Sequence, residues 1–276
     1  MTHSARRGQR LLHLAGRGRQ LRADARIRTG TNAAVEWTDE GIVLGVRRHG
    51  EGNAIVELLT RRRGRHLGMV RGGTSRRHAS LLQPGNSVAA TWRARLDEHM
   101  GNYALEPSVV RSDVLMRVPH AAYGFTHMAQ MLHLLPERDP HEGLYFTLGA
   151  ILDAFEQREA AGMLLARFEL ALLAEMGFGL ELDTCAATGR RDDLVYVSPR
   201  SGRAVCREAG APYSERLFAL PGFLIGQGPT DPEDVEAALR LTGHFLLARA
   251  LEPRGLGFSE ARAAFLGAWR REPAPG

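Results

Sequence analysis

Residues 41–73 read GIVLGVRRHGEGNAIVELLTRRRGRHLGMVRGG, and this stretch decides the fold of the N-terminal part of the chain. Apolar residues alternate with other residues over 41–47, which predicts a half-buried β-strand. A turn-forming cluster at 49–53 separates this strand from an apolar run at 54–60, so the two segments are expected to form a hairpin. A third short strand is predicted over 65–71, where Gly72 and Gly73 then break it.

Two more strand candidates follow, and all five together suggest a barrel. Apolar side chains alternate over 88–94, and a fifth run surrounds Tyr103. Five short strands within about 75 residues favour a small closed barrel, and the five-stranded oligonucleotide-binding (OB-fold) barrel is the leading candidate. We therefore expect an N-terminal OB-fold domain at residues 35–115.

The hydrophobic period becomes helical after residue 116. Helices are predicted at 123–135, 144–159, 161–176, about 230–251, and in a short segment after Ser259. This part of the chain is net acidic, with 16 arginines against 21 acidic residues, which suits a structural bundle that docks other proteins. The whole chain is therefore predicted to be an α+β multidomain protein with a helical domain at 116–276.

The charge pattern of the barrel is the most informative feature of the sequence. Between Leu58 and Leu96 there is no acidic residue, but there are nine arginines: Arg61, Arg62, Arg63, Arg65, Arg71, Arg76, Arg77, Arg93 and Arg95. Like charges in a row repel, so such a stretch is best tolerated where a polyanion supplies the counter-charge, and nucleic acid is the natural polyanion. We interpret these arginines as phosphate contacts whose binding weakens as salt rises. The alternative is a solvated basic face without a partner.

Stacking on bases needs exposed aromatic rings, and the barrel sequence contains few. Trp92 alternates with core positions, so it is assigned to the core. Tyr103 is the better stacking candidate, with a barrel-closing contact as the alternative. Recognition of specific bases is therefore not expected.

The formal net charge of +5 over 276 residues is unevenly distributed. Residues 1–34 contain eight arginines and one acid, Asp24, and are expected to be disordered. The explanations considered are a start codon placed too far upstream, a basic arm for nucleic acid, and a targeting peptide. No apolar run approaches the roughly 20 residues of a membrane-spanning helix, and a secretory signal is absent, so a cytoplasmic protein is expected.

The sequence offers little support for an enzyme, since it has neither a glycine-rich phosphate loop nor a Gly-x-Ser-x-Gly nucleophile elbow. Four histidines cluster between residues 120 and 141, namely His120, His127, His133 and His141. No pair of them has the i, i+4 spacing that places two imidazoles on one helix face. They are assigned to the core or the surface, and a metalloenzyme is kept only as a third hypothesis.

Cys185 and Cys206 are the only cysteines, which excludes a disulfide framework. They bracket a segment with the outline of a four-cysteine zinc knuckle that lacks the second cysteine of each C-x-x-C pair. Two soft ligands with no histidine between them make a stable tetrahedral zinc site improbable, so no cofactor is predicted. The knuckle-like insert, at about 183–212, is expected to be held by packing alone.

The chain resembles the RecO family of bacterial recombination mediators over about residues 35–270. The resemblance rests on the order and spacing of several segments rather than on any single one. They are Glu36-Trp37, the strand at 41–47, Gly50-Glu51-Gly52-Asn53, the turn at 59–64, Arg71-Gly72-Gly73, Leu82-Gln83-Pro84-Gly85, and Phe168 to Phe178 leading into Cys185.

The resemblance implies an OB-fold barrel, a helical domain and a zinc-knuckle-like insert. It also implies binding of single- and double-stranded DNA, annealing of complementary strands, and action with the RecR protein and the single-strand-binding protein to load RecA recombinase. The DNA-contacting role falls on the barrel arginines named above. The sequence departs from zinc-binding members at Thr188 and Ala209, where thiols would be expected. Family members begin near Glu36, which favours the explanation that the start codon of this chain was placed too far upstream. An RNA- or ribosome-associated OB-fold protein is the alternative.

Overall fold

The structure is a computed structural model that describes residues 34–228 and 230–271. The expectations for residues 1–34 therefore fall almost entirely outside the described residues. The chain divides into two compact units, one with residues up to 117 and residues 136–153, the other with residues 118–135 and residues from 154 onward. The sequence prediction placed a single boundary after residue 115, whereas the structure assigns 136–153 to the first unit.

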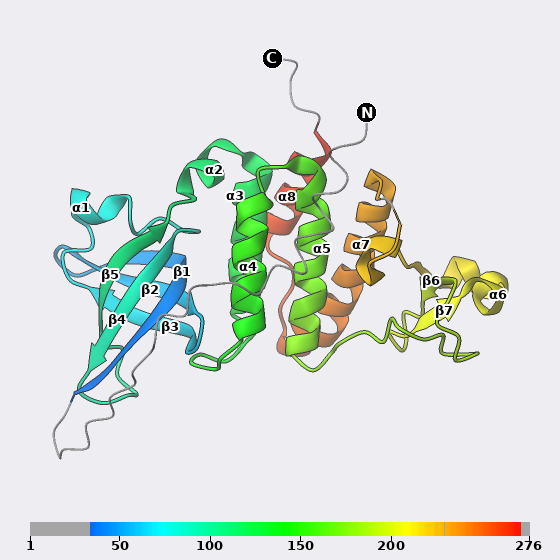
Figure 1. The fold of residues 1–276 in the computed structure, drawn as a ribbon, viewed down its shortest axis with the longest axis horizontal. Coiled ribbons are helices and arrows are strands. Elements are labelled where there is room, and N and C mark those ends of the chain that lie inside the picture. The colour runs from blue at the N-terminus through cyan, green and yellow to red at the C-terminus, as the bar shows by residue number, and fades with distance from the viewer. Residues whose placement is uncertain (1–33, 229, 272–276) are drawn as a thin grey trace. The chain divides into compact units, whose positions relative to one another are not determined.

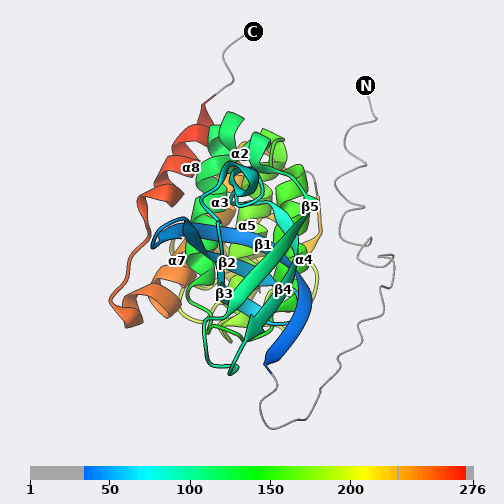
Figure 2. The ribbon, with the colours of Figure 1, turned by 90° about the vertical axis from the view of Figure 1, so that its left-hand side faces the viewer.

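Five strands of the first unit close into a barrel in the order β1-β2-β3-β5-β4 (Figures 1 and 2). They are β1 (Val35–His49), β2 (Asn53–Thr60), β3 (Gly64–Val70), β4 (Ser87–Ala94) and β5 (Asn102–Val109). The 15-residue β1 pairs antiparallel with both β2 and β4, and β5 closes the barrel against β3 through a parallel bridge between Met69 and Asn102. The short helix α1 (Arg76–Ala79) lies between β3 and β4. All five strands occur where the sequence predicts them.

The interior of the barrel is filled by four rings. The indoles of Trp37 and Trp92 stack with centroids 5.5 Å apart, and the imidazole of His66 meets the Trp92 ring edge-on at 5.1 Å. Tyr103 completes the group, with its hydroxyl oxygen 3.1 Å from His66 Nδ1. Gly68 leaves room for the phenol, since a Cβ there would lie 2.3 Å from the Tyr103 ring. Buried aliphatic residues such as Val43, Val56 and Leu58 belong to the same core cluster.

A segment from beyond the barrel completes the first unit. It runs from residue 136 through the helix α4 (Glu142–Ala154). The amide of Arg138 donates to the carbonyl of Arg65 on β3 at 2.8 Å. Gly64 makes this approach feasible, because its φ is +64° and a Cβ there would lie 1.8 Å from the carbonyl oxygen of Asp139. The helix α2 (Ser112–Arg117) follows β5 in the same unit.

The second unit is a helical bundle with a small sheet inserted in it. Its main helices are α3 (Pro119–Leu132), α5 (Arg158–Glu175), α7 (Pro232–Phe245) and α8 (Glu260–Arg270), and a π-helical segment, Leu246–Leu251, extends α7. Within the unit α3 packs on α8, and α5 packs on α7. Asp231 accepts a hydrogen bond from the amide of Asp234 at 2.8 Å and caps the N-terminus of α7.

A buried carboxylate links the four helices of the bundle. Glu169 of α5 accepts hydrogen bonds from His127 of α3 at 2.9 Å, from Thr242 of α7 at 2.5 Å and from Arg262 of α8 at 2.8 Å. Burial alone would raise the pKa of Glu169, but the Arg262 guanidinium and the His127 hydrogen bond lower it to about 2. His127 is thus part of the core, as the sequence predicts for these histidines.

The inserted sheet has the order β7-β6-β8, formed by β6 (Leu194–Val197), β7 (Ala204–Cys206) and β8 (Phe218–Ala219). Three short helical turns accompany it: α6 (Arg207–Gly210), η1 (Ala211–Arg216) and η2 (Gly222–Ile225). Arg249 in the π-helical segment fastens the insert, since its guanidinium donates to the carbonyls of Phe178 and Ser201 at 3.2 and 2.9 Å. Among the described residues, none of the helices has the length and apolar character to cross a membrane.

Replacing Gly64 by alanine is expected to lower the free energy of unfolding of the first unit by about 3 kcal/mol, from the positive φ and the clash with Asp139 together. Gly72 has the same φ of +64° but has nothing within 4 Å of its Cβ position. Gly72→Ala should therefore cost only about 1 kcal/mol. Urea unfolding of both variants measures the difference, and equal losses would show that 136–139 does not constrain the turn.

The burial of His66 should make the stability of the barrel depend on pH. Burial, with the nearby charge of Arg138, lowers the pKa of His66 from 6.5 to about 4. Between these values the unfolded chain binds a proton that the folded chain does not, so stability falls as the pH drops from 7.5 to 4. The wild type should lose about 3 kcal/mol more over this range than His66→Gln, because the other titrating groups are common to both proteins. Parallel pH dependences in urea unfolding would contradict the burial of a neutral imidazole.

Candidate nucleic-acid interface

The barrel places the nine predicted arginines at two separate ends. Arg61, Arg62 and Arg63 form the turn between β2 and β3, and Arg65 follows on β3 itself. Arg71 follows the end of β3, and Arg76 and Arg77 lie in α1. Arg93 lies near the end of β4, and Arg95 just beyond it. The nine positions do not form one continuous stripe.

Three of these arginines are already paired with carboxylates of the first unit. Arg61 contacts Glu142 of α4 at 2.6 Å, and Arg93 contacts Glu36 of β1 at 2.9 Å. Arg65 is the most buried of the set and lies 2.5 Å from Glu57. A guanidinium held by a carboxylate has less charge to offer a phosphate, so these three are weaker candidates than the sequence suggested.

Arg62 and Arg63 occupy the same turn without such a pair among the described residues. The amide of Arg62 donates to Asp39 Oδ2 at 2.7 Å, which fixes the turn but leaves the guanidinium exposed. The guanidinium carbon of Arg63 lies 5.7 Å from the centre of the Trp37 ring. This turn keeps some positive charge, but much of it is offset by the acids around it.

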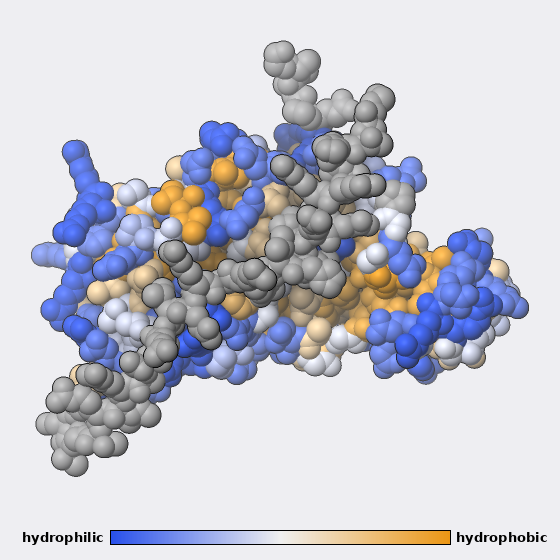
Figure 3. Space-filling view, in the orientation of Figure 1, coloured by the Kyte–Doolittle hydropathy of each residue, from blue (hydrophilic) through white to orange (hydrophobic). Residues whose placement is uncertain are grey.

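The other end of the barrel carries the unpaired charge. Arg71 and Arg95 lie there and are exposed, and no described carboxylate is within ion-pair distance of them. Arg76 and Arg77 of α1 are also exposed and have no ion pair among the described residues, but Arg77 lies near the start of β4 and the end of β5. Figure 3 shows hydrophilic side chains along the outer edge of this unit. We call the end formed by the β1–β2 turn, the end of β3 and the β4–β5 loop (residues 95–101) the basic end.

Arg47 and Arg48 also belong to the basic end, and the sequence analysis did not select them. Both are exposed near the end of β1, and the strand register places Arg48 opposite Ala54, which in turn lies opposite Val70. They therefore lie close to Arg71 at the same end of the barrel. The two adjacent arginines are visible in the sequence, but they precede the acid-free stretch between Leu58 and Leu96.

An open hollow of about 320 Å³ lies at the basic end. Its lining includes His49, Met69, Arg95, His99, Met100 and Asn102, from the ends of β1 and β3, the β4–β5 loop and the start of β5. A second hollow, of about 340 Å³, lies between α1 and β5 and includes Arg77 and His78 in its lining. Both hollows combine cationic and apolar groups.

The β4–β5 loop is held in place by the barrel core and by the added segment. The indole Nε1 of Trp92 donates to the carbonyl of Met100 at 2.8 Å, and the amide of Met69 donates to the carbonyl of Gly101 at 3.0 Å. The guanidinium of Arg138 donates to the carbonyls of Asp97 and His99. Gly101 has a φ of +64°, and a Cβ there would lie 2.4 Å from the Trp92 ring. The loop is therefore fixed before any ligand binds.

Tyr103 does not offer an exposed ring for stacking, although the sequence made it the better stacking candidate and it was counted among the DNA-contacting residues. Its side chain is only 5% exposed and points into the barrel, where it contacts His66. Burial raises the pKa of its hydroxyl far above the usual value. The run Tyr103-Ala104-Leu105 is too short for alternation to show which face is internal. The structure shows the alternative, a contact inside the barrel between Tyr103 and His66.

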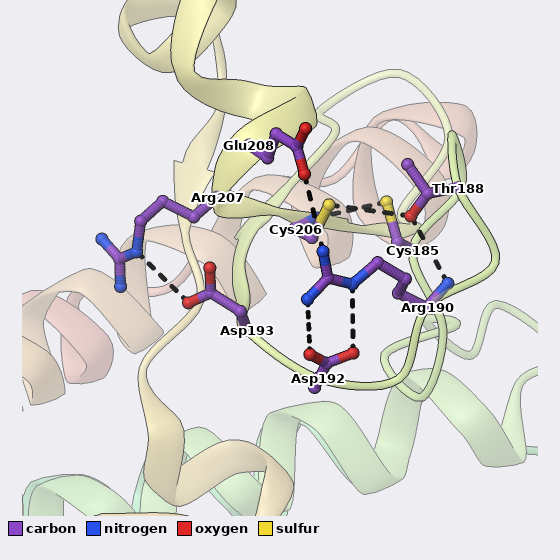
Figure 4. A network of polar contacts seen from close by, with 8 residues as sticks. All are labelled: Cys185, Thr188, Arg190, Asp192, Asp193, Cys206, Arg207 and Glu208. Atoms are coloured by element: carbon purple, nitrogen blue, oxygen red, sulfur yellow. Dashed lines mark hydrogen bonds and ion pairs between the residues drawn. The ribbon is translucent and has the colours of Figure 1, made fainter.

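The insert brings the two cysteines together but not a zinc site (Figure 4). The amide of Cys206 donates to Cys185 Sγ at 3.3 Å, and Thr188 Oγ1 lies 3.7 Å from Cys206 Sγ. Burial alone would raise the pKa of Cys185, but hydrogen bonds from the Thr188 hydroxyl and from backbone amides lower it to about 6. Ala209 supplies no ligand, and no group of three or more potential metal-binding side chains occurs among the described residues.

Charged groups around the two sulfurs are occupied with one another. Arg190 contacts Asp192 at 2.5 Å and Glu208 at 3.5 Å, and Arg207 contacts Asp193 at 3.2 Å (Figure 4). Two thiols and a hydroxyl do not match the nitrogen and sulfur set of a structural zinc site. The residues present therefore do not fit zinc, and the zinc-free insert remains a prediction.

Fold and interface together define a two-unit α+β protein, with a barrel that carries unpaired arginines at one end and a helical bundle with a small inserted sheet. The family description "Recombination protein O N terminal" matches residues 34–106, and "Recombination protein O C terminal" matches residues 117–255. The chain belongs to the RecO family of DNA repair proteins.

Curated relatives agree with this assignment. A DNA repair protein RecO of Xanthobacter autotrophicus is 81% identical over 241 residues, which cover 87% of this chain and all of the relative. Proteins of the same name from Afipia carboxidovorans and Nitrobacter hamburgensis are 56% and 57% identical, over 86% and 85% of this chain and 97% and 94% of theirs. DNA repair and recombination are thus the processes with which this family is associated.

Arg138→Met is expected to loosen the β4–β5 loop while the barrel stays folded. The variant removes the guanidinium that holds the carbonyls of Asp97 and His99 but keeps an apolar side chain of similar length. Hydrogen exchange of the amides at 97–101 should become at least 10-fold faster, and exchange in β2 should change little. Unchanged exchange in the loop would mean that the hydrogen bonds from Trp92 and Met69 hold it without Arg138.

Proposed function

We propose that this protein is a recombination mediator that binds single- and double-stranded DNA through the basic end of its barrel and promotes the annealing of complementary strands. The observation that carries the proposal is a group of exposed arginines around a preformed loop, Arg47, Arg48, Arg71 and Arg95, which have no carboxylate partner in the part of the chain that the structure describes. Each such side chain can neutralise a phosphate and release counterions. Membership of the RecO family supports DNA as the polyanion.

Annealing follows physically from such a surface. Two DNA strands repel each other through their phosphates, and a cationic surface that holds one strand lowers this repulsion for the second. Exposed arginines also lie away from the β4–β5 loop, in α1 and in the turn after β2. The barrel therefore has charge available for more than one strand.

The proposal includes partners and excludes catalysis by this chain. RecR and the single-strand-binding protein are the proposed partners, RecA is loaded indirectly, and the net acidic helical unit is assigned to protein docking. No cofactor is required, because the proposed work consists of binding, screening and handing over strands. The proposed place of action is the bacterial cytoplasm, at the nucleoid.

Fluorescence anisotropy of labelled oligonucleotides at several salt concentrations tests the DNA-binding step. The full chain should bind single- and double-stranded DNA, with log affinity falling linearly with log salt. Arg48→Ala combined with Arg71→Ala should reduce the slope for single strands by about 1.4, since each lost phosphate contact removes about 0.7. Arg61→Ala combined with Arg93→Ala removes the same formal charge from paired positions and should change the slope far less.

Three outcomes count against the proposal. Absence of DNA binding would overturn it, and so would equal slopes for the two double variants, which would place the contacts elsewhere. A marked preference for RNA in competition would favour the RNA- or ribosome-associated alternative.

A further inference from the structure

We infer that the hollow beside the β4–β5 loop receives one unstacked base of a single strand, so that the barrel distinguishes single-stranded from double-stranded DNA. This inference rests on the proposed function, because it assigns a ligand group to the same basic end. The phosphate contacts proposed above are common to both forms of DNA. The hollow adds a contact that only an unpaired base can make.

The size and position of the hollow suit a single base. Its volume of about 320 Å³ is at the lower limit of ordinary small-molecule sites, which are about 300–1,000 Å³. Its lining includes the exposed Arg95 and His49, the last residue of β1, which follows Arg47 and Arg48 in the chain. A strand whose phosphates contact these arginines would therefore lie beside the hollow.

The lining provides stacking surfaces other than Phe, Tyr or Trp. Trp37, Trp92 and Tyr103 are all buried in the core, so none of them is available to a base. The exposed imidazoles of His49 and His99 line the hollow instead, beside the partly exposed thioether of Met100. Histidine is one of the side chains on which unpaired bases stack, and the polarizable sulfur of methionine packs well against rings.

Asn102 adds a polar group to the lining at the start of β5. Its buried Oδ1 receives no hydrogen bond from the described residues, although most buried polar atoms in proteins are paired. This acceptor atom is therefore unsatisfied within the described barrel. A base edge, which carries both donors and acceptors, matches a side-chain amide of this kind.

The hollow exists before the ligand arrives. Trp92 and Arg138 fix the carbonyls of Met100 and His99, and Met69 fixes that of Gly101. A preformed site loses little conformational freedom on binding. A base in a duplex would first have to leave its stack and its pair, which costs a few kcal/mol, whereas a base in a single strand is already free.

The test compares three labelled ligands of equal length and phosphate count per strand: single-stranded DNA, a blunt duplex, and a single strand with abasic sites in place of its bases. The variant is His99→Ala combined with Met100→Ala, both exposed in the loop. Leu96→Ala is the matched control, since Leu96 is an exposed apolar residue of the same loop that does not line the hollow. Circular dichroism and urea unfolding confirm that both variants fold.

We expect the double variant to bind the single strand at least fivefold more weakly, in line with base stacking of about 1–3 kcal/mol, and to bind the duplex within twofold of the wild type. The wild type should prefer the normal single strand to the abasic strand by a similar factor, and the double variant should lose that preference. Leu96→Ala should retain it.

Equal losses on single strand and duplex would overturn the inference and leave the proposed function standing, because phosphate contacts alone would then explain binding. The same holds if the wild type binds abasic and normal strands equally. Failure of the wild type to bind any of the three ligands would overturn the proposed function itself.

Discussion

The stacked rings inside the barrel are the constraint on which the N-terminal unit depends. Trp37 and Trp92 stack in the interior, with centroids 5.5 Å apart, and the Trp92 ring excludes a side chain at Gly101. The one polar atom of the Trp92 indole needs a partner when buried, and it donates to the carbonyl of Met100. The same ring that closes the core thus positions the β4–β5 loop. The hollow at the basic end therefore depends on the hydrogen bond that the buried Trp92 indole makes to Met100, a residue of its lining.

The arginines show why a charge count along the chain differs from the charge that a ligand meets. Arg93 pairs with Glu36, 57 residues away, and Arg61 pairs with Glu142, 81 residues away. These acids lie outside the acid-free stretch, so that stretch looked more basic than the folded surface is. Arg47 and Arg48 lie outside it too, but the hairpin register returns them to the end of β3. Only the folded barrel separates paired arginines from unpaired ones.

The insert is held together without a donor set that fits zinc. Its sheet has buried apolar residues, and Arg249 fastens it by hydrogen bonds to two carbonyls. Exposed ion pairs such as Arg190 with Asp192 contribute little, because solvent screens them, so packing and backbone hydrogen bonds account for most of its stability. The backbone around the two cysteines is also hydrogen-bonded: the amide of Cys206 donates to Cys185 Sγ, and the amide of Cys185 donates to the carbonyl of Arg190. The fold of the insert is therefore compatible with Thr188 and Ala209 at these positions.

Periodicity in the sequence determined the five strands and the main helices, because alternation and helical spacing report directly which residues must leave water. The ordered motifs from Glu36 to Cys185 carried the family resemblance, and the arginine count indicated a polyanion. Tertiary structure decided what local patterns do not encode. It turned Tyr103 inward, paired Arg61 and Arg93 with distant acids, and joined residues 136–153 to the barrel unit. Each of these depends on contacts between residues far apart in the chain, which form only when the barrel closes.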